Sequence, residues 1–308
     1  MKRMDQARID AVLNYIKSKE SPSKGDPRVK QIVNRLLEDL FNAMADLDIT
    51  SEEMWIACDY LQQLGKNGEW GLVFAGLGIE HFIDVKMDWE DEVSGIEFGT
   101  PRTIEGPLYV AGAPESKSYA ELETIPEPNA ERLYMSGFVL DETGTPIEGA
   151  KVEVWHCNLK GLYSYFDSSQ PEFNLRRAII TDIDGRYEFK SFLPTGYSCP
   201  PGSCTETLMS LLGRHSSRPA HIHFFVKAPG FRKLTTQINI EGDPLIFEDF
   251  AFATREGLIP PVQRIPAYKA SEYGKEEAFA KIEFNFNLVR EQEHLPDGEN
   301  NRTRVSIS

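Results

Sequence analysis

Residues 133–157 read LYMSGFVLDETGTPIEGAKVEVWHC, and this stretch decides the fold. Two segments in which apolar and polar side chains alternate flank a turn-forming segment rich in Asp, Gly, Thr and Pro. A period of two places successive side chains on opposite faces of a strand. The stretch therefore predicts a strand, a turn and a second strand.

The same signal recurs through the rest of the chain. AIITD (178–182) and RYEF (186–189) flank a turn, and HIHFFVKA (221–228), KLTTQINI (233–240) and KIEFNFNLV (281–289) follow. Several short strands with turns between them favour an antiparallel sandwich or barrel over a parallel sheet. We predict an antiparallel β-sandwich domain over residues 133–290.

Upstream, the period changes to that of helices, and we predict a helical domain over residues 1–97. Asp26-Pro27 is a typical helix start, and Thr50 with Glu53 forms a capping box. The third helix is expected to stop at Gly65. A fourth helix is expected to carry Leu72, Ala75, Ile79 and Phe82. The fold class is thus α+β, a helical domain followed by the sandwich.

Between the two domains, residues 98–132 contain prolines at 101, 107, 114, 126 and 128. Proline lacks an amide donor and clashes with a preceding helical turn, so this segment cannot be helical. We expect an extended connector that crosses the surface and contributes to the pocket. Residues 291–308 form a polar tail.

Composition limits the possible partners. The 308 residues include 33 Lys and Arg against 48 Asp and Glu, a net charge of −15, which argues against a nucleic-acid partner. The longest apolar stretch, residues 71–79, is too short for a membrane span. Four cysteines lack paired spacing, and the N-terminus has no signal-peptide pattern, so a cytoplasmic location is expected.

The segment RPAHIHFF (218–225) carries the first chemical signal. On a strand, His221 and His223 lie on one face, while Ile222 points to the opposite face. Two neighbouring imidazoles on one strand supply half of a transition-metal site. The pair taken alone is equally consistent with ordinary packing.

Two tyrosines in turn-rich settings strengthen the signal: Tyr163 in GLYSYF (161–166) and Tyr197 in PTGYSCPP (194–201). A phenol ionises near pH 10 by itself, but a trivalent metal stabilises the phenolate. Two phenolates with two imidazoles suit Fe(III) better than zinc or Fe(II). Ring cleavage at Fe(II) would instead require two histidines and a carboxylate.

The ordered set of GxY, PxGYxCPP, RPAHIHF and TTQ resembles the intradiol ring-cleaving dioxygenases. The segment GTPRTIEGPLYVAGAP (99–114) resembles the catechol 1,2-dioxygenase branch in particular. The resemblance runs from the helical N-terminus to the last strand. It implies one Fe(III) per subunit, held by Tyr163, Tyr197, His221 and His223.

The resemblance also assigns roles to other positions. Arg218 corresponds to the arginine that faces the substrate, Gln237 to a polar residue near it, and Tyr197 to the ligand that leaves the metal and takes up a proton. The ring-contacting positions fall on Leu72, Ala75, Ile104, Pro107, Leu108, Arg218, Phe250 and Ala251.

The implied activity is cleavage of catechol by O2 to cis,cis-muconate in aromatic degradation, the β-ketoadipate pathway. The resemblance further implies a homodimer through the N-terminal helices, with a lipid at its interface. Hydroxyquinol or chlorocatechol is the alternative substrate, and a non-catalytic β-sandwich binding module is the alternative from another class.

Other side chains leave choices open. His156 and His215 lie near the site motifs and belong either to the surroundings of the metal or to the structural framework. The pair Arg176-Arg177 is interpreted as a solvated or locally paired face, with a contact to a partner as the alternative.

Overall fold

The computed structural model describes residues 4–96 and 99–292. The chain divides after Gly68 into two compact units. The polar tail expected at 291–308 lies almost wholly outside the described residues, as does the expected domain boundary between residues 97 and 98. The division of the chain into domains at that boundary stays a prediction.

The first unit contains three helices: α1 (Gln6–Lys17), α2 (Pro27–Asp46) and α3 (Ser51–Asn67). The Asp26 carboxylate accepts from the first amides of α2, and Thr50 and Glu53 form the predicted capping box of α3. The expected stop at Gly65 is wrong. The helix continues to Asn67 because Gly68, with φ of 69°, adopts the left-handed cap conformation that favours glycine.

Helix α2 has no buried residue. Its apolar stripe is exposed, and includes Val29, Ile32, Val33, Leu36 and Leu40, which are 42–62% exposed. An amphipathic helix normally covers its apolar side.

The second unit opens with two short helices where one was expected. Helix α4 (Trp70–Gly76) ends at Leu77, and α5 (Ile79–Val93) begins after Gly78, whose φ is 75°. The prediction of a single fourth helix is wrong because Gly78 leaves the right-handed helical conformation, which an apolar stripe does not reveal.

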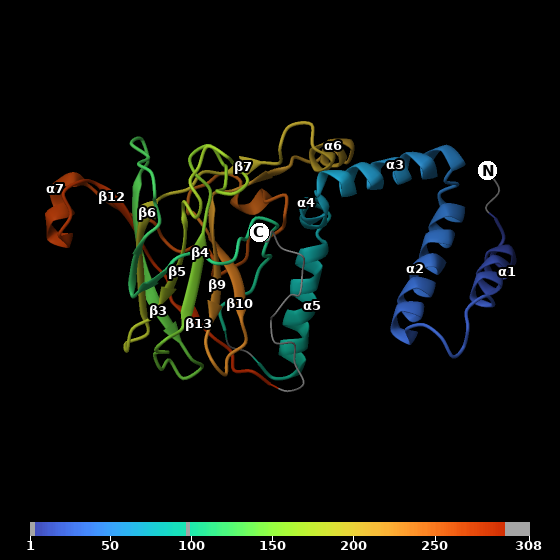
Figure 1. Cartoon of the computed structure of the whole chain (residues 1–308), viewed down its shortest axis with the longest axis horizontal. Helices are drawn as coiled ribbons and strands as arrows, with labels where there is room; N and C mark the ends of the chain where they lie inside the picture. The colour runs from blue at the N-terminus through green and yellow to red at the C-terminus, as the bar shows by residue number, and fades with distance from the viewer. Residues whose placement is uncertain (1–3, 97–98, 293–308) are drawn as a thin grey trace. The chain divides into compact units, whose positions relative to one another are not determined.

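Two sheets form the body of this unit (Figure 1). The first has the order β1-β5-β4-β9-β10 and the second β11-β12-β3-β6-β2, with β13 on β3. Their strands are β1 (Glu115–Lys117), β2 (Tyr119–Glu121), β3 (Arg132–Leu140), β4 (Lys151–Trp155), β5 (Arg176–Ile180), β6 (Arg186–Phe192), β9 (His221–Lys227), β10 (Leu234–Asn239), β11 (Gln263–Ile265), β12 (Phe279–Glu283) and β13 (Phe286–Asn287).

Smaller elements complete the unit. They are the ribbon of β7 (Tyr197–Ser198) and β8 (Ser217–Arg218), the helices α6 (Cys204–Leu211) and α7 (Ala267–Ala270), and the single turns η1 (Ile246–Glu248) and η2 (Ser271–Tyr273).

One apolar core lies between the two sheets. Met135 of β3, Phe189 of β6, Val154 of β4 and Phe224 of β9 belong to the same buried cluster. The predicted β-sandwich is therefore confirmed. Most strand pairs are antiparallel, but β1 and β2 near the start and β12 and β13 near the end join their sheets in parallel.

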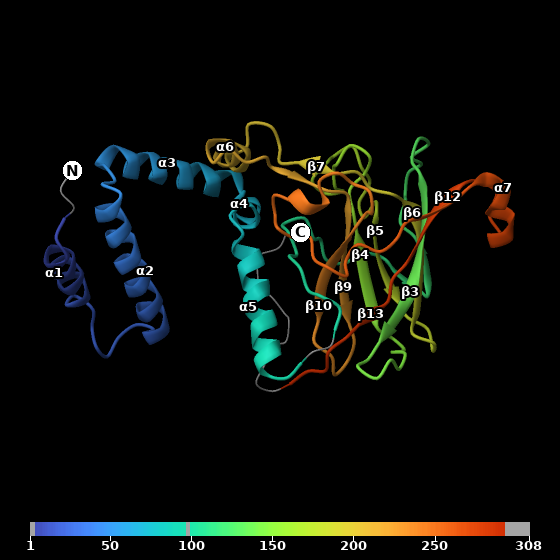
Figure 2. The same cartoon turned by 180° about the vertical axis from the view of Figure 1, so that it is seen from behind.

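The connector does not cross the surface as expected. Residues 103–106 are buried, and residues 115–121 form the edge strands β1 and β2 of both sheets. Hydrogen bonds to the rest of the unit make this burial possible: the Thr103 amide donates to the Thr235 carbonyl (3.0 Å), and the Thr236 hydroxyl to the Pro101 carbonyl (2.8 Å). The connector therefore belongs to the sandwich, which Figure 2 shows from behind.

Over the described residues, no helix combines the length and apolar character that a bilayer crossing requires. The cytoplasmic location stays a prediction.

Candidate metal centre

The two histidines of the HIH segment lie on β9, between β4 and β10. Ile222 enters the inter-sheet core, whereas His221 and His223 are buried on the opposite face, 1% and 2% exposed. Their Nε2 atoms lie 3.1 Å apart. The alternation expected from the sequence is confirmed, and it directs both imidazoles to one point.

Neighbouring groups fix the orientation of each ring. The carbonyl of Pro219 lies 2.6 Å from Nδ1 of His221, so Nδ1 carries the hydrogen and the Nε2 lone pair faces His223. The His223 ring stacks on Trp155 with centroids 4.9 Å apart and planes 3° from parallel. Packing holds the two Nε2 atoms in place.

Both imidazoles are neutral. Burial lowers the pKa of His221 to about 3, and the nearby Arg218 cation lowers it further. Burial and His221 lower the pKa of His223 well below its ordinary value. Neutral imidazole nitrogen is the form that binds a metal.

Tyr163 reaches the same point from the loop after β4. Gly161 makes this possible: its φ is 74°, and a Cβ added there would lie 2.4 Å from Cβ of Tyr197. The Asn158 side chain accepts from the amides of Lys160 and Leu162 (2.9 and 3.0 Å), which shapes the loop. The glycine of the GxY motif therefore allows the two tyrosine segments to touch.

Tyr197 lies on β7, opposite Arg218 of β8. Gly196 precedes it, and a Cβ there would lie 2.7 Å from the Arg218 carbonyl. The Tyr197 hydroxyl lies 3.4 Å from that of Tyr163 and 3.5 Å from Nε2 of His221. Four potential donor atoms from three separate segments thus converge.

The chemistry of this donor set fits a trivalent cation. Burial raises the pKa of Tyr163 well above its ordinary value, and it also raises the pKa of Tyr197. Both phenols are neutral unless a strong cation stabilises the phenolates. Over the described ranges, no group of three or more His, Cys, Asp and Glu side chains is arranged for a metal.

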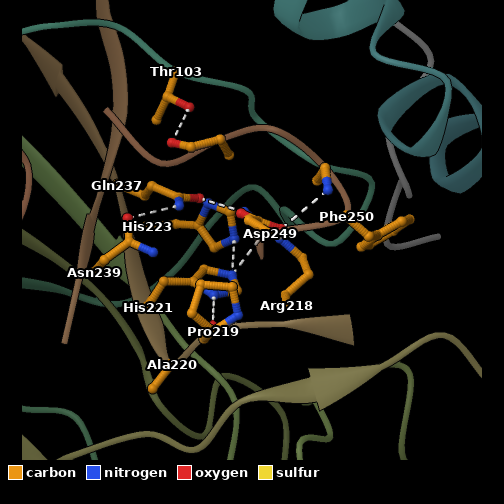
Figure 3. Close-up of polar contacts among 12 residues, drawn as sticks. Thr103, Arg218, Pro219, Ala220, His221, His223, Gln237, Asn239, Asp249 and Phe250 are labelled. Carbon is orange, nitrogen blue, oxygen red and sulfur yellow. Dashed lines mark hydrogen bonds and ion pairs between the residues drawn. The ribbon is translucent and has the colours of Figure 1, made fainter. Parts of the chain in front are cut away.

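Arg218 lies beside the donors, with Nη1 2.9 Å from Nε2 of His221 (Figure 3). It is held from behind by Asp249, at 3.1 Å from Nε and 2.9 Å from Nη2, and by Oε1 of Gln237 at 2.8 Å. Nε2 of Gln237 donates in turn to Asn239 at 3.3 Å. These buried hydrogen bonds hold the guanidinium in an orientation in which Nη1 faces the donor set.

Charge complementarity stabilises this pair. Burial alone would lower the pKa of Arg218, but Asp249 and Tyr197 raise it above its ordinary value. Burial alone would raise the pKa of Asp249, but Arg218 lowers it overall. Asp249 is therefore an anion engaged with Arg218, and it is not an additional donor to the histidine pair.

The expected ring-contacting residues divide between two apolar clusters. Ala75, Ile104, Phe250 and Ala251 share one cluster, and Leu72 packs against it. Leu108 packs against the second, which contains Tyr163 and Trp155. Pro107 is half-buried and belongs to neither cluster, yet it precedes Leu108 directly.

The connector passes close to the histidines. A Cβ added to Gly106 would lie 3.8 Å from Cε1 of His223. Ile104 and Leu108 flank this point, so segments far apart in the sequence surround the donor set with apolar side chains.

Comparison with known proteins agrees with this geometry. Residues 104–290 match the family model described as "Dioxygenase", and residues 26–95 match "Catechol dioxygenase N terminus". Catechol 1,2-dioxygenase 2 of Acinetobacter lwoffii is 55% identical over 268 residues, 87% of this chain and 97% of the relative. The chain belongs to the intradiol dioxygenase family.

Within this family, the chain falls in the catechol 1,2-dioxygenase branch. The wild-type catechol 1,2-dioxygenase structure from Acinetobacter radioresistens superposes with a TM-score of 0.93 at 47% identity, over 99% of both chains. Relatives named as hydroxyquinol and chlorocatechol 1,2-dioxygenases are more distant, at 33% identity.

Two other histidines, His156 and His215, lie outside the donor set of this intradiol dioxygenase. His156 is buried, with Nδ1 2.7 Å from the Cys157 carbonyl and Nε2 2.7 Å from the Ser191 hydroxyl. It therefore belongs to the framework. His215 is exposed and accepts a hydrogen bond from the Ser217 amide.

Sequence reasoning missed two residues at this site of the family fold. Asp249 is one of 48 acidic residues and carries no motif of its own. The interpretation of Arg176-Arg177 as a solvated or locally paired face is wrong for Arg176, which is 1% exposed. Its side chain turns inward because it lies on the face of β5 that covers the Tyr163 loop.

Proposed function

We propose that this protein cleaves catechol between its two hydroxyl-bearing carbons with O2, giving cis,cis-muconate, at a non-heme Fe(III) site. Tyr163, Tyr197, His221 and His223 would hold the iron. The observation that carries the proposal is the convergence of two phenol oxygens and two imidazole nitrogens, with neighbouring donors 3.1–3.5 Å apart. Bound Fe(III) would supply Lewis-acid and one-electron chemistry to a chelated catechol.

Tyr197 is suited to move a proton. It is only half-buried, and it lies on a two-residue strand, whereas Tyr163 is fully buried. As a phenolate, its Oη would accept a proton from a catechol hydroxyl. The short β7–β8 ribbon gives the ring more freedom than a long strand would.

Arg218 would orient the substrate and stabilise negative charge on the ring. Its Nη1 faces the donor set because Asp249 and Gln237 occupy its other nitrogens. A preorganised cation in a buried site stabilises developing charge without the reorganisation that water requires.

The apolar clusters would hold the flat ring and exclude water. Burial of apolar surface stabilises bound ligand by roughly 25 cal/mol per Å². Ala75, Ala251 and Ala253 are the small side chains of the cluster that contains Phe250, and the preference among substituted rings would depend on this wall.

Isotope labelling tests the reaction. The purified enzyme is incubated under ¹⁸O₂ with catechol, hydroxyquinol and a chlorocatechol in parallel, and the products are analysed by mass spectrometry. We expect both labelled atoms in cis,cis-muconate, the highest kcat/KM with catechol, and a large loss in Tyr197→Phe. A ring-opened semialdehyde would indicate cleavage outside the two hydroxyl-bearing carbons and would contradict the proposal. No turnover, together with no effect of Tyr197→Phe, would favour the binding module.

We also propose a homodimer through the first unit. The exposed apolar stripe of α2 would be covered by the same stripe of a second copy, and a lipid chain would lie against it. Light scattering should give twice the chain mass for the wild type and the chain mass for Val33→Glu combined with Leu36→Glu. Extraction and mass spectrometry of the dimer test the lipid. A monomeric wild type would contradict the dimer.

A further inference from the structure

Arg176 is a buried cation beside one of the proposed ligands. It is the first residue of β5 and is 1% exposed. Its guanidinium carbon lies 5.7 Å from the centroid of the Tyr163 ring. The donor set does not include it, and no motif pointed to it.

Its hydrogen-bond partners are neutral. Nε donates to the Ser164 hydroxyl (2.8 Å) and Nη2 to the Ser164 carbonyl (3.1 Å), while Nη1 has no hydrogen-bond partner among the described residues. Burial lowers the pKa of Arg176 to about 10, and the groups that oppose this shift are the phenols of Tyr163, Tyr165 and Tyr109. Within the described ranges, it forms an ion pair with no carboxylate.

This differs from the other buried arginines of the unit. Arg218 pairs with Asp249, and Arg232 pairs with Asp91 at 2.7 and 2.9 Å. A buried charge without an opposite charge is costly, so an anion that formed beside Arg176 would be stabilised by it.

We propose that Arg176 is the countercharge of the Tyr163 phenolate. The proposal rests on the proposed iron site, because only metal binding makes Tyr163 an anion. Tyr165 and Tyr109 lie outside the donor set. Arg176 thus lies where it stabilises negative charge on the Tyr163 ring once the metal binds, whereas Arg218, beside Tyr197, is already paired with Asp249.

The test uses the iron-loaded full chain and three variants. Arg176→Met keeps an unbranched side chain, shorter than that of arginine, and removes the charge, and Arg176→Lys keeps the charge. Arg177→Met is the matched control, because the neighbouring arginine is half-buried and donates to the backbone carbonyls of Phe173 (3.0 Å) and Arg176 (2.7 Å). The measured quantity is the wavelength of the tyrosinate-to-Fe(III) absorption band.

The sign of the shift follows from electrostatics. Removal of the cation beside the Tyr163 ring would raise the energy of the phenolate donor orbital, so the transition energy would fall. We expect Arg176→Met to move the band to longer wavelength, with Arg176→Lys close to the wild type and Arg177→Met unchanged. The shift should persist in a Tyr197→Phe background, where Tyr163 is the remaining phenolate.

A second readout is the rise in Tm on iron loading. It should be smaller for Arg176→Met than for Arg176→Lys, because only the charged side chain stabilises the loaded state. A change of structure alone would affect both variants and both states.

The outcomes separate this proposal from the proposed function. A wild-type band with no shift in Arg176→Met would overturn the role of Arg176 and leave the iron site intact. A different result would identify an inorganic anion as the partner of Arg176. In that case the Tm of the metal-free wild type rises with chloride, this dependence is lost in Arg176→Met, and the band does not shift. The proposal would then be wrong. A wild type without the band would overturn both proposals.

Discussion

Gly161 determines how closely the two tyrosine segments approach. A methyl group there would lie 2.4 Å from Cβ of Tyr197, in addition to the strain of a side chain at φ 74°. We predict that Gly161→Ala displaces Tyr197 and lowers the tyrosinate absorption and kcat/KM at least about tenfold, the cost of about 1.4 kcal/mol in the transition state. Iron content, absorption and steady-state kinetics measure this.

Gly144→Ala is the matched control. Gly144 has a similar φ of 79°, but nothing lies within 4 Å of its Cβ position. Both variants pay about 1 kcal/mol of backbone strain, so a difference between them reports the contact with Tyr197. Equal, small effects would contradict the role of Gly161 in the site.

The Asp249 carboxylate accepts two hydrogen bonds from Arg218. It also accepts one from the backbone amide of Ala251, at 3.0 Å. We predict that Asp249→Asn frees the guanidinium and the loop that carries Phe250, with kcat/KM for catechol reduced by about 10- to 100-fold. Loss of one partner of a buried pair costs about 3–5 kcal/mol, so Tm falls as well. Asp249→Glu should recover part of kcat, and equal kinetics for both variants would contradict the assignment.

At this scale, the sequence predicts the residues that carry chemistry better than those that support them. His221 and His223 follow from the period of a strand, and the two tyrosines from their glycine-containing turns. Asp249 and Arg176 were missed because their roles depend on burial, and burial of a charged side chain is set by contacts between segments far apart in the chain.

Among the elements, α5 carries a buried carboxylate whose ionisation opposes folding. Asp84 is 9% exposed, and its Oδ2 has no hydrogen-bond partner within the described residues. Burial raises the pKa of Asp84 to about 7, although Arg255 and Arg102 lower it and Asp88 and Glu80 raise it further. The folded protein therefore keeps a proton that the unfolded chain releases near pH 4.

The sign of the pH dependence follows from this difference. Between about pH 4 and pH 7 Asp84 binds more protons in the folded than in the unfolded state, so its contribution to stability falls as the pH rises and levels off above pH 7. At neutral pH, burial of Asp84 lowers the free energy of unfolding by up to about 4 kcal/mol, which is about three pKa units at roughly 1.4 kcal/mol each. We predict that Asp84→Asn abolishes this pH-dependent decrease. Denaturant unfolding at pH 4.5 and 7.5 measures it.

Asp184→Asn, in an exposed turn, is the control for that prediction. It should leave the difference between the two pH values as in the wild type. An Asp84→Asn variant whose difference between the two pH values equals that of the wild type would contradict the account of α5.

The other elements show which features a periodic sequence pattern can predict and which it cannot. The strands and the starts of α2 and α3 follow from alternation and from caps, which are local. The break at Gly78 does not follow from a local pattern, because a stripe of apolar residues looks the same on one helix or two. The burial of the connector does not either, because it depends on non-local hydrogen bonds such as that of Thr103 to the Thr235 carbonyl.

For the whole molecule, the second unit gathers its site from segments spread over nearly 180 residues. Leu72 of α4, Ile104 of the connector and Phe250 after η1 meet in one apolar cluster. The sandwich supplies rigid positions for the histidines, and the loops supply the tyrosines. The fold class was therefore predictable from sequence, as were the four side chains that converge, whereas the way the connector closes over β9 was not.

The visible absorption spectrum of the purified protein tests the iron site most directly. It is recorded before and after addition of catechol without oxygen, with Tyr163→Phe and Tyr197→Phe beside the wild type. The account predicts a red, iron-dependent tyrosinate-to-Fe(III) band that shifts when catechol binds. A protein that stays colourless after iron loading would contradict the tyrosinate site.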